Sequence, residues 1–169
     1  MAVLTIRTYP DPALRKRCRP VKAVDAGLAA LAADMAETLR AAPGVGLAAP
    51  QVGEDIRLIV VDLSVGTDPA QLHVLMNPEV VSAEGEQMEE EGCLSLPGVH
   101  ERVRRALRVR VRALNPRGEE ILLDGQGVLA RVLLHEMDHL EGKLILDHLN
   151  REKRDVLKKR LKRLSRAAS

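Results

Sequence analysis

The segment "LLHEMDHLEG" (133–142) places two histidines four residues apart, with a glutamate directly after the first. In an α-helix, residues four apart lie on the same face, so His135 and His139 can bind the same metal ion. Glu136 lies beside them, where it can face a water molecule on that ion. A catalytic tetrahedral metal site usually has three protein ligands and one open position, so the pattern requires a third ligand from elsewhere.

The residues after the second histidine do not supply that ligand. One large class of zinc peptidases continues the motif as H-E-x-x-H-x-x-G-x-x-H. The chain has Gly142 at the required position, but Ile145 stands where the last histidine would be. His148 is out of step with the pattern, and Glu152 begins a strongly basic stretch that we expect to be a separate surface helix. A peptidase of this class that cuts internal peptide bonds is therefore disfavoured.

The chain has two cysteines, and one of them is a candidate for the third ligand. Cys18 stands in "RKRCRP", a stretch too charged for a ligand, whereas Cys93 stands in "EEEGCLSLPG", which we expect to be extended. Most free cysteines are small buried hydrophobes, and Cys93 considered alone fits that description. Considered with a helix that needs one more ligand, Cys93 becomes the best candidate, because a Cys/His/His set leaves a fourth position open. Glu91 and His100 are the alternatives.

Length and composition limit the possible folds and functions. With 169 residues, 46% of them hydrophobic, the chain is long enough for one domain with a substantial core. Only 1% are aromatic, which disfavours a protein that stacks single-stranded nucleic acid on aromatic rings. The N-terminus shows no secretory signal, and no stretch approaches the ~18 apolar residues of a membrane span. We therefore expect a cytoplasmic protein without a membrane contact and without a disulfide.

The charges are unevenly distributed along the chain. Residues 151–166, "REKRDVLKKRLKRLSR", hold nine Lys and Arg against two acidic residues, a local net charge of +7. Since the whole chain carries +2, the remainder carries about −5. We expect a catalytic region over residues 1–150 and a basic C-terminal helix over 151–169 of the same domain. A nucleic-acid-binding module with a purely structural metal site is the alternative, but such sites usually have four protein ligands and only three are found.

Three segments have the apolar spacing of helices. In residues 25–42, apolar residues recur three and four apart behind Asp25, which is an N-cap residue. The segment "GVLARVLLHEMDHLEG" (127–142) is apolar on most sides, which predicts a buried central helix that ends at Gly142. The last helix is expected to begin near residue 150, with an apolar stripe of Leu157, Leu161 and Leu164.

Between these helices the apolar period changes to two. The opening "AVLTIRTYPDP" is read as a short strand, "IRLIVVDL" (56–63) as a buried strand, and "LHVLMNPEVVS" (72–82) as a pair of strands around Asn77-Pro78. The segment "LRVRVRAL" (107–114) alternates, and "NPRG" turns it into "EEILLDG", which predicts a hairpin. The fold class is therefore α+β, with antiparallel or mixed strands around a central buried metal-binding helix and with N-terminal and C-terminal helices.

A third segment of interest, "PGVGLAAPQVG" (43–53), is rich in small residues, which allow a backbone to approach another chain closely. Gln51 is the one long polar amide in it. In this order, "GVGLAAPQ" (44–51), "EGCLS" (91–95) and "LHEMDHLEG" (134–142) closely resemble the motifs of the peptide deformylase family, G-x-G-L-A-A-x-Q, E-G-C-L-S and Q-H-E-x-D-H-L-x-G. The resemblance spans about residues 4–150. It implies a hydrolase that removes the N-formyl group from the formylmethionine of nascent polypeptides and releases formate.

The resemblance implies a role for each matching residue. Metal ligands would be Cys93, His135 and His139, and Glu136 would be the general acid and base. Gln51 and the backbone N–H of Leu94 would donate to the oxyanion, while Gly46 and Gly92 would align the peptide backbone. Our own candidates for an apolar slot that takes the methionine side chain are three valines, which are otherwise ordinary core residues: Val45, Val128 and Val132.

The resemblance also implies a cofactor and partners. The metal would be one divalent ion per chain, ferrous iron (Fe2+), which Zn2+, Ni2+ or Co2+ can replace. The substrates would be N-formylmethionyl nascent peptides, and the basic C-terminal helix would contact the ribosome. A solvated helix that simply packs on the body is the alternative for that segment. Two positions depart from the family pattern: Leu134 replaces the usual glutamine before the first metal histidine, and "VRR" (103–105) replaces Val-Pro-Arg. Glu91 either steers a ligand histidine or pairs with Arg105, and the sequence does not decide between the two.

Overall fold

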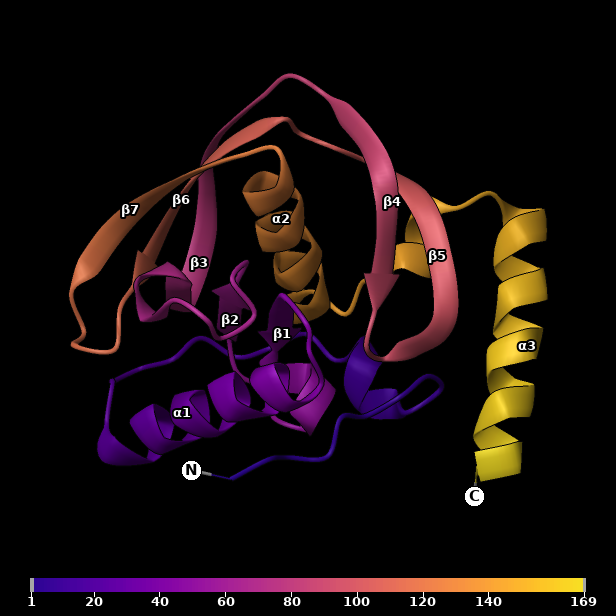
Figure 1. Cartoon of the computed structure of the whole chain (residues 1–169), viewed down its shortest axis with the longest axis horizontal. Helices are drawn as coiled ribbons and strands as arrows, with labels where there is room; N and C mark the ends of the chain where they lie inside the picture. Colours follow the sequence, from indigo (N-terminus) through magenta and orange to yellow (C-terminus); the bar gives the residue numbers. More distant parts are fainter. Residues whose placement is uncertain (1, 169) are drawn as a thin grey trace.

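Helix α2 (Val128–Leu140) lies at the centre of the molecule, between an arch of β-strands and helix α1 (Ala26–Ala41) (Figure 1). The computed structural model describes residues 2–168, so residues 1 and 169, at the outer ends of the two expected regions, lie outside it. The remaining elements, in chain order, are η1 (Pro12–Arg15), β1 (Gly46–Ala48), η2 (Ala49–Val52), β2 (Leu58–Asp62), η3 (Pro69–Gln71), β3 (Leu72–Glu84), β4 (Gln87–Cys93), β5 (Leu96–Arg105), β6 (Arg108–Leu114), β7 (Glu120–Gln126), η4 (Ile145–His148) and α3 (Arg151–Ala168).

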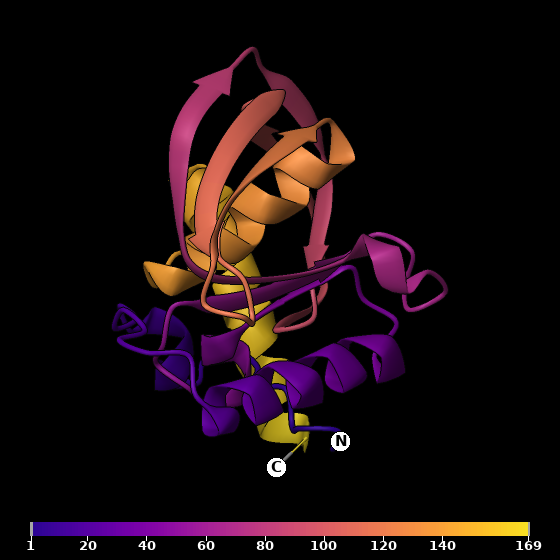
Figure 2. The same cartoon turned by 90° about the vertical axis from the view of Figure 1, so that its left-hand side faces the viewer.

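The strands form two separate antiparallel sheets. Five strands form one sheet in the order β1-β2-β3-β6-β7, and β4 and β5 form a hairpin of their own. Seen from the side, these strands arch over α2, and the chain turns from β3 into β4 at the top of the molecule (Figures 1 and 2). The predicted α+β class and the predicted buried central helix are both confirmed.

Strand β6 shows why the large sheet faces α2. Its Val109, Val111 and Ala113 are buried, while the arginines between them are exposed. This alternation gives one apolar and one solvated face. The apolar face packs against Ala130 and Leu133 of α2, which have no exposed surface. Apolar contacts with the sheet therefore hold one side of α2 and leave its other side for the polar residues of the motif.

Helix α1 and the β6–β7 hairpin form as their local sequences predict. The Asp25 side chain accepts a hydrogen bond from the Leu28 backbone N–H at 2.8 Å, so Asp25 is the N-cap of α1. The β6–β7 turn begins at Asn115, whose carbonyl accepts from the Gly118 N–H at 2.9 Å. Both features depend on contacts within a few residues, which a sequence specifies directly.

Two strand predictions were wrong. Residues 2–8 form no strand; instead backbone N–H groups of this extended segment make single hydrogen bonds to separate elements, such as Arg7 N–H to the Gln51 carbonyl at 2.6 Å and Leu4 N–H to Thr38 Oγ1 at 2.8 Å. Residues 72–82 form one strand, β3, instead of a pair. Asn77 takes a left-handed φ of 51° inside β3, and a bulge between Met76 and Glu79 absorbs the irregularity without ending the strand.

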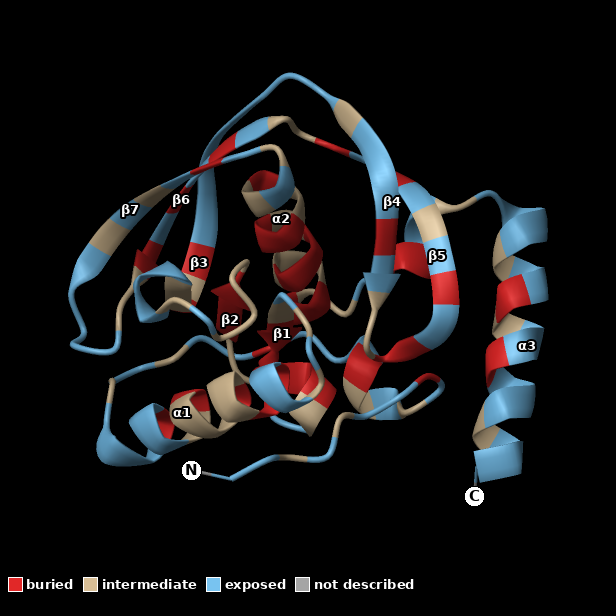
Figure 3. Cartoon of the chain, in the orientation of Figure 1, coloured by how far each residue is buried: buried red, intermediate tan, exposed pale blue. Residues whose placement is uncertain are grey.

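Helix α3 lies against β5 at one side of the molecule, with its buried residues facing the body (Figure 3). Leu157 and Leu161 are buried in a cluster with Val99 of β5 and Leu146 of η4. The prediction that Leu164 continues this apolar stripe was wrong, because Leu164 is 47% exposed. The helix is therefore buried against the body along its first three turns, to Leu161, and its last two turns hold no buried residue.

We expect Gly142→Ala to destabilise the fold more than Gly98→Ala. Both glycines have left-handed φ values, +73° and +75°, where a side chain costs about 1–3 kcal/mol. A Cβ at Gly142 would also lie 2.6 Å from the Arg15 carbonyl oxygen, whereas one at Gly98 has nothing within 4 Å. Urea unfolding of both variants measures the difference. Equal losses in the free energy of unfolding would show that the contact with Arg15 is not limiting.

Candidate metal centre

Three potential metal ligands from two elements lie close together. Cys93 lies at the end of β4, and His135 and His139 lie one turn apart on α2. One ligand atom from each lies within 4.8 Å of the others, and Cys93 Sγ is 3.4 Å from His139 Nε2. Within residues 2–168 this is the only such group of three or more His, Cys, Asp or Glu side chains. The structure therefore brings together the set that the sequence suggested.

Glu91 contacts the His135 ring at Nδ1. One of its carboxylate oxygens lies 3.0 Å from His135 Nδ1, and both oxygens accept hydrogen bonds of 2.9 Å from the Arg105 guanidinium. Glu91 thus does both of the things between which the sequence could not decide. A carboxylate at the far nitrogen of a histidine ligand fixes the ring orientation and leaves the other nitrogen, Nε2, toward the metal.

The two histidines have opposite electrostatic surroundings. Burial lowers the pKa of His135, but the charge of Glu136 and hydrogen bonds with Cys93 and Glu91 outweigh burial and raise that pKa well above its usual value. Burial and the nearby charge of His135 lower the pKa of His139 well below its usual value. A neutral imidazole is the form that binds a metal, so His139 is already in the binding form.

Glu136 lies beside the candidate ligands, and one of its two carboxylate oxygens has no partner among the described residues. Its Oε1 atom is buried and has no hydrogen bond from any described residue, and Oε2 is 4.0 Å from His135 Nε2. Burial, together with the charge of Glu91, raises the pKa of Glu136 to about 7. The Gly46 backbone lies so close to this carboxylate that a Cβ at Gly46 would be only 2.5 Å from Oε2. A carboxylate with a pKa near neutrality, beside an open cavity, is suited to proton transfer.

Gln51 is buried at the opposite side of the cluster. Its Oε1 accepts from the Ala48 N–H at 2.9 Å, and its Nε2 donates to Ser95 Oγ at 3.0 Å and lies 3.7 Å from Cys93 Sγ. The amide is thus held with its N–H groups toward the cysteine. Ser95 was missed by the sequence reasoning, although its place two residues after Cys93 in an otherwise apolar segment was a signal.

A cavity of about 480 Å³ opens beside these residues. It is bounded by the segment before β1, by the end of β4 and by one face of α2. The residues predicted to bind substrate or the oxyanion all line this cavity: Val45, Gly46, Gln51, Gly92, Leu94, Val128 and Val132. Four further lining residues were not assigned to it from the sequence: Pro43, Gly44, Glu90 and Arg131. His100 also lines it, and a Cβ at Gly92 would lie 3.1 Å from the His100 ring.

Comparison with known proteins decides the family. Residues 3–155 match the family model described as polypeptide deformylase. The chain is 49% identical to peptide deformylase 1 of Burkholderia multivorans, over 99% of this chain and 92% of that protein. A crystal structure of a peptide deformylase from Legionella pneumophila superimposes with a TM-score of 0.92 at 42% identity, covering 99% of this chain and 98% of that one. The chain belongs to the polypeptide deformylase family.

Membership confirms the resemblance drawn from the three motifs, and with it an enzyme that is a metal-dependent hydrolase. The two departures from the family pattern fit this deformylase fold. Leu134 is partly buried and packs against the core around α2, and Arg104, which stands in place of the proline, is exposed between the buried Val103 and Arg105. None of the helices within residues 2–168 is long and apolar enough to cross a membrane.

The other cysteine lies outside the candidate metal centre. Cys18 is buried in the core beneath α2, and its backbone N–H donates to the Leu140 carbonyl at 2.9 Å. Burial raises the pKa of its thiol to about 11. A protonated thiol in an apolar environment neither binds metals nor reacts readily, so Cys18 is a natural control for Cys93.

We expect Cys93→Ala to lose most of its metal, whereas Cys18→Ala keeps it. A ligand set reduced to two histidines binds divalent ions far more weakly, because each missing ligand removes a metal–protein bond. Elemental analysis of the two variants, purified in parallel, provides the measurement. Full metal occupancy in Cys93→Ala would contradict the assignment of Cys93 as a ligand and would leave Glu91 and His100 as the candidates for the third ligand.

Proposed function

We propose that this deformylase removes the N-formyl group from the N-terminal formylmethionine of nascent polypeptides through a centre formed by Cys93, His135 and His139. The supporting observation is a Cys/His/His set, with both histidines buried and the cysteine half-buried, at the wall of a cavity. Beside it lies a carboxylate whose Oε1 has no partner among the described residues. The products are formate and a free methionine amino group. The family supplies the reaction, and the geometry supplies a role for each residue.

The donor set suits a first-row divalent ion. One thiolate and two imidazoles are borderline-soft ligands that bind Fe2+, Co2+, Ni2+ and Zn2+, unlike the oxygen donors that Mg2+ and Ca2+ prefer. We assign Fe2+ as the ion, with the other three as replacements, in keeping with the family resemblance. Bound there, such an ion would make a water molecule more acidic and polarise the formyl oxygen.

Glu136 is the proposed general acid and base. Its Oε1 has no partner among the described residues, and its pKa of about 7 lets the same group accept and release a proton near neutrality. It takes a proton from the attacking water molecule and delivers it to the amine that leaves. Its position one residue after His135 keeps the carboxylate beside the ligand set throughout.

Gln51 and Leu94 are the proposed donors to the developing oxyanion. The Gln51 amide is fixed by Ala48 and Ser95, so its N–H groups need no reorganisation when charge appears. The backbone of Leu94 follows Cys93 directly and lines the same cavity. Donors held in place before the reaction stabilise charge that exists only in the tetrahedral intermediate, and one such donor typically contributes ~10²–10³ in rate.

The peptide is proposed to bind in an extended form between two strand edges. β1 pairs only with β2, and β4 pairs only with β5, so each has a second edge, and residues of both line the cavity. An extended peptide can add to such an edge through backbone hydrogen bonds. Gly46 and Gly92 leave room for its backbone. The methionine side chain enters the apolar part of the cavity beside Val45, Val128 and Val132.

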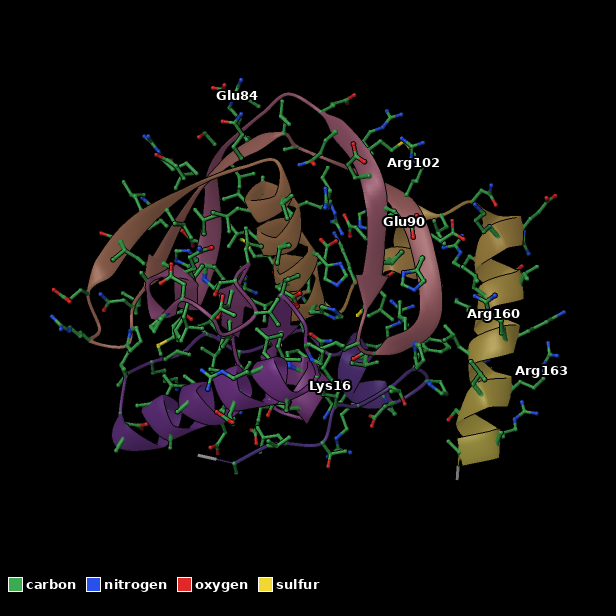
Figure 4. The ribbon with its side chains drawn as sticks, in the orientation of Figure 1. Lys16, Glu84, Glu90, Arg102, Arg160 and Arg163 are labelled. Atoms are coloured by element: carbon green, nitrogen blue, oxygen red, sulfur yellow. The ribbon has the colours of Figure 1, made fainter. Side chains whose placement is uncertain are left out.

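The basic helix is proposed to contact the ribosome, which places the reaction in the cytoplasm where chains emerge. The outer face of α3 is strongly basic and does not pack on the body. Figure 4 shows Arg163 on the side of α3 turned away from β5, whereas Arg160 donates to the Gly98 carbonyl at 3.3 Å. A basic helix face of this kind binds the phosphates of RNA without sequence preference.

We expect Glu136→Ala to retain its metal but to lose about 10²–10⁴ in kcat, the usual contribution of a general acid or base. Glu136→Gln, which keeps the size of the side chain, should lose as much, because it cannot transfer the proton. Formate release from a formyl-methionyl peptide and metal content are measured on the same samples. A metal-free variant, or one nearly as active as the parent, would show that Glu136 has another role.

We expect Lys159→Gln/Arg163→Gln to weaken association with ribosomes while deformylation of a short peptide is unchanged. Both side chains are exposed on α3, and each substitution removes one positive charge that can bind a phosphate. The control Lys16→Gln/Lys22→Gln removes two exposed charges from another part of the surface. Co-sedimentation at several salt concentrations gives the comparison. Equal binding by both double variants would exclude α3 as the contact, and substitution avoids exposing the core that deletion of the helix would uncover.

A further inference from the structure

Arg105 stands at the centre of a buried polar network that the reaction described above does not use. Its guanidinium binds Glu91 of β4 through two hydrogen bonds of 2.9 Å and Asp138 of α2 through one of 2.6 Å. His148 of η4 completes the network, with Nε2 2.8 Å from the same Asp138 oxygen. Four elements, β4, β5, α2 and η4, therefore meet through side chains at one point.

The burial of this network makes its pairing important. Only 4% of the Arg105 and Glu91 side chains and 22% of the Asp138 side chain are exposed. A buried ion that loses one partner costs far more than the loss of a surface pair, because water cannot replace the missing charge. Removing Asp138 would therefore leave Glu91 as the one carboxylate paired with Arg105 among the described residues.

The network joins the two parts of the protein that supply the metal ligands. Cys93 belongs to β4, whose only strand partner is β5, whereas both histidines belong to α2. Glu91 lies two residues before Cys93, and Asp138 lies directly before His139. Since Arg105 binds both carboxylates, it sets how far β4 stands from α2, and with it the separation of the cysteine from the histidines.

We propose that Asp138 and His148 are positioning residues of the metal site, an inference that rests on the proposed function. They hold Arg105 against Glu91, and Glu91 in turn fixes the ring of His135. Neither is hydrogen-bonded to a ligand atom; their hydrogen bonds reach the metal site through Arg105 and Glu91. The chemistry at the metal then depends on a residue of η4, outside the motif helix.

His148 is placed to orient Asp138. Its side chain is 31% exposed, and η4 is held in the core by Ile145 and Leu146, both buried. Because the Nε2–H of His148 donates to the Asp138 oxygen that Arg105 also binds, the carboxylate cannot rotate away from Arg105 without losing both hydrogen bonds.

The test is the rate at which the zinc-loaded full-length protein releases Zn2+ to a chromogenic chelator, measured well below the unfolding temperature of each variant. Outer partners of metal ligands typically contribute about 10–100-fold in metal affinity. We expect Asp138→Asn to release zinc about tenfold faster than the parent, and His148→Leu to release it several-fold faster. His148→Gln, which keeps an N–H donor, should restore most of the difference. In Asp138→Asn/His148→Leu the effects should not add, because both residues act through Arg105.

Asp124→Asn is the matched control. It breaks an exposed Arg110–Asp124 ion pair between β6 and β7 of the five-stranded sheet and should leave zinc release unchanged. Release at the parental rate from both Asp138→Asn and His148→Leu would overturn the inference. So would additive effects in the double variant. If Asp138→Asn does not fold, the two partly exposed His148 variants still decide the matter. A parent protein that binds no zinc would instead overturn the metal site itself.

Discussion

The rest of the structure depends on burying three ionisable side chains on one helix. His135, Glu136 and His139 are 8%, 4% and 1% exposed. Their charged forms are unfavourable in a protein interior unless neighbouring groups pair with them. The neighbours come from elsewhere in the chain: Glu91 for the first histidine and Cys93 for the second. The fold can be understood as the means of placing these partners around α2.

The two sheets divide this task. The five-stranded sheet presents apolar side chains such as Val111 to α2 and packs against it in one hydrophobic cluster. The β4–β5 hairpin approaches the other side of the helix and carries the polar partners, Glu91, Cys93 and Arg105. An apolar contact alone would fix the helix but not its rotation to within the tolerance that a metal site needs. The buried charged pairs add directional constraints, which apolar packing lacks.

Close backbone approach connects this scaffold to its chemistry. At Gly46 the chain passes so near Glu136 that no side chain fits, and at Gly92 the strand leaves space that the His100 ring partly fills. The same two glycines lie at the strand edges that border the cavity. Small residues therefore leave room for the substrate backbone as well as for close packing. This dual use accounts for a segment, residues 43–53, that combines Gly and Ala with the buried Gln51.

The sequence by itself determined the features whose causes are local. The spacing of His135 and His139, the N-cap Asp25 and the β6–β7 hairpin each depend on residues within one or two turns, and all appear as expected. The tertiary structure alone decided the Gln51–Ser95 bond across 44 residues, the Arg105–Asp138 pair across 33, and the single backbone bonds of residues 2–8 that replace the predicted strand. Hydrogen bonds and ion pairs between distant segments depend on which elements the whole core brings together, and periodicity along the chain contains no information about that choice.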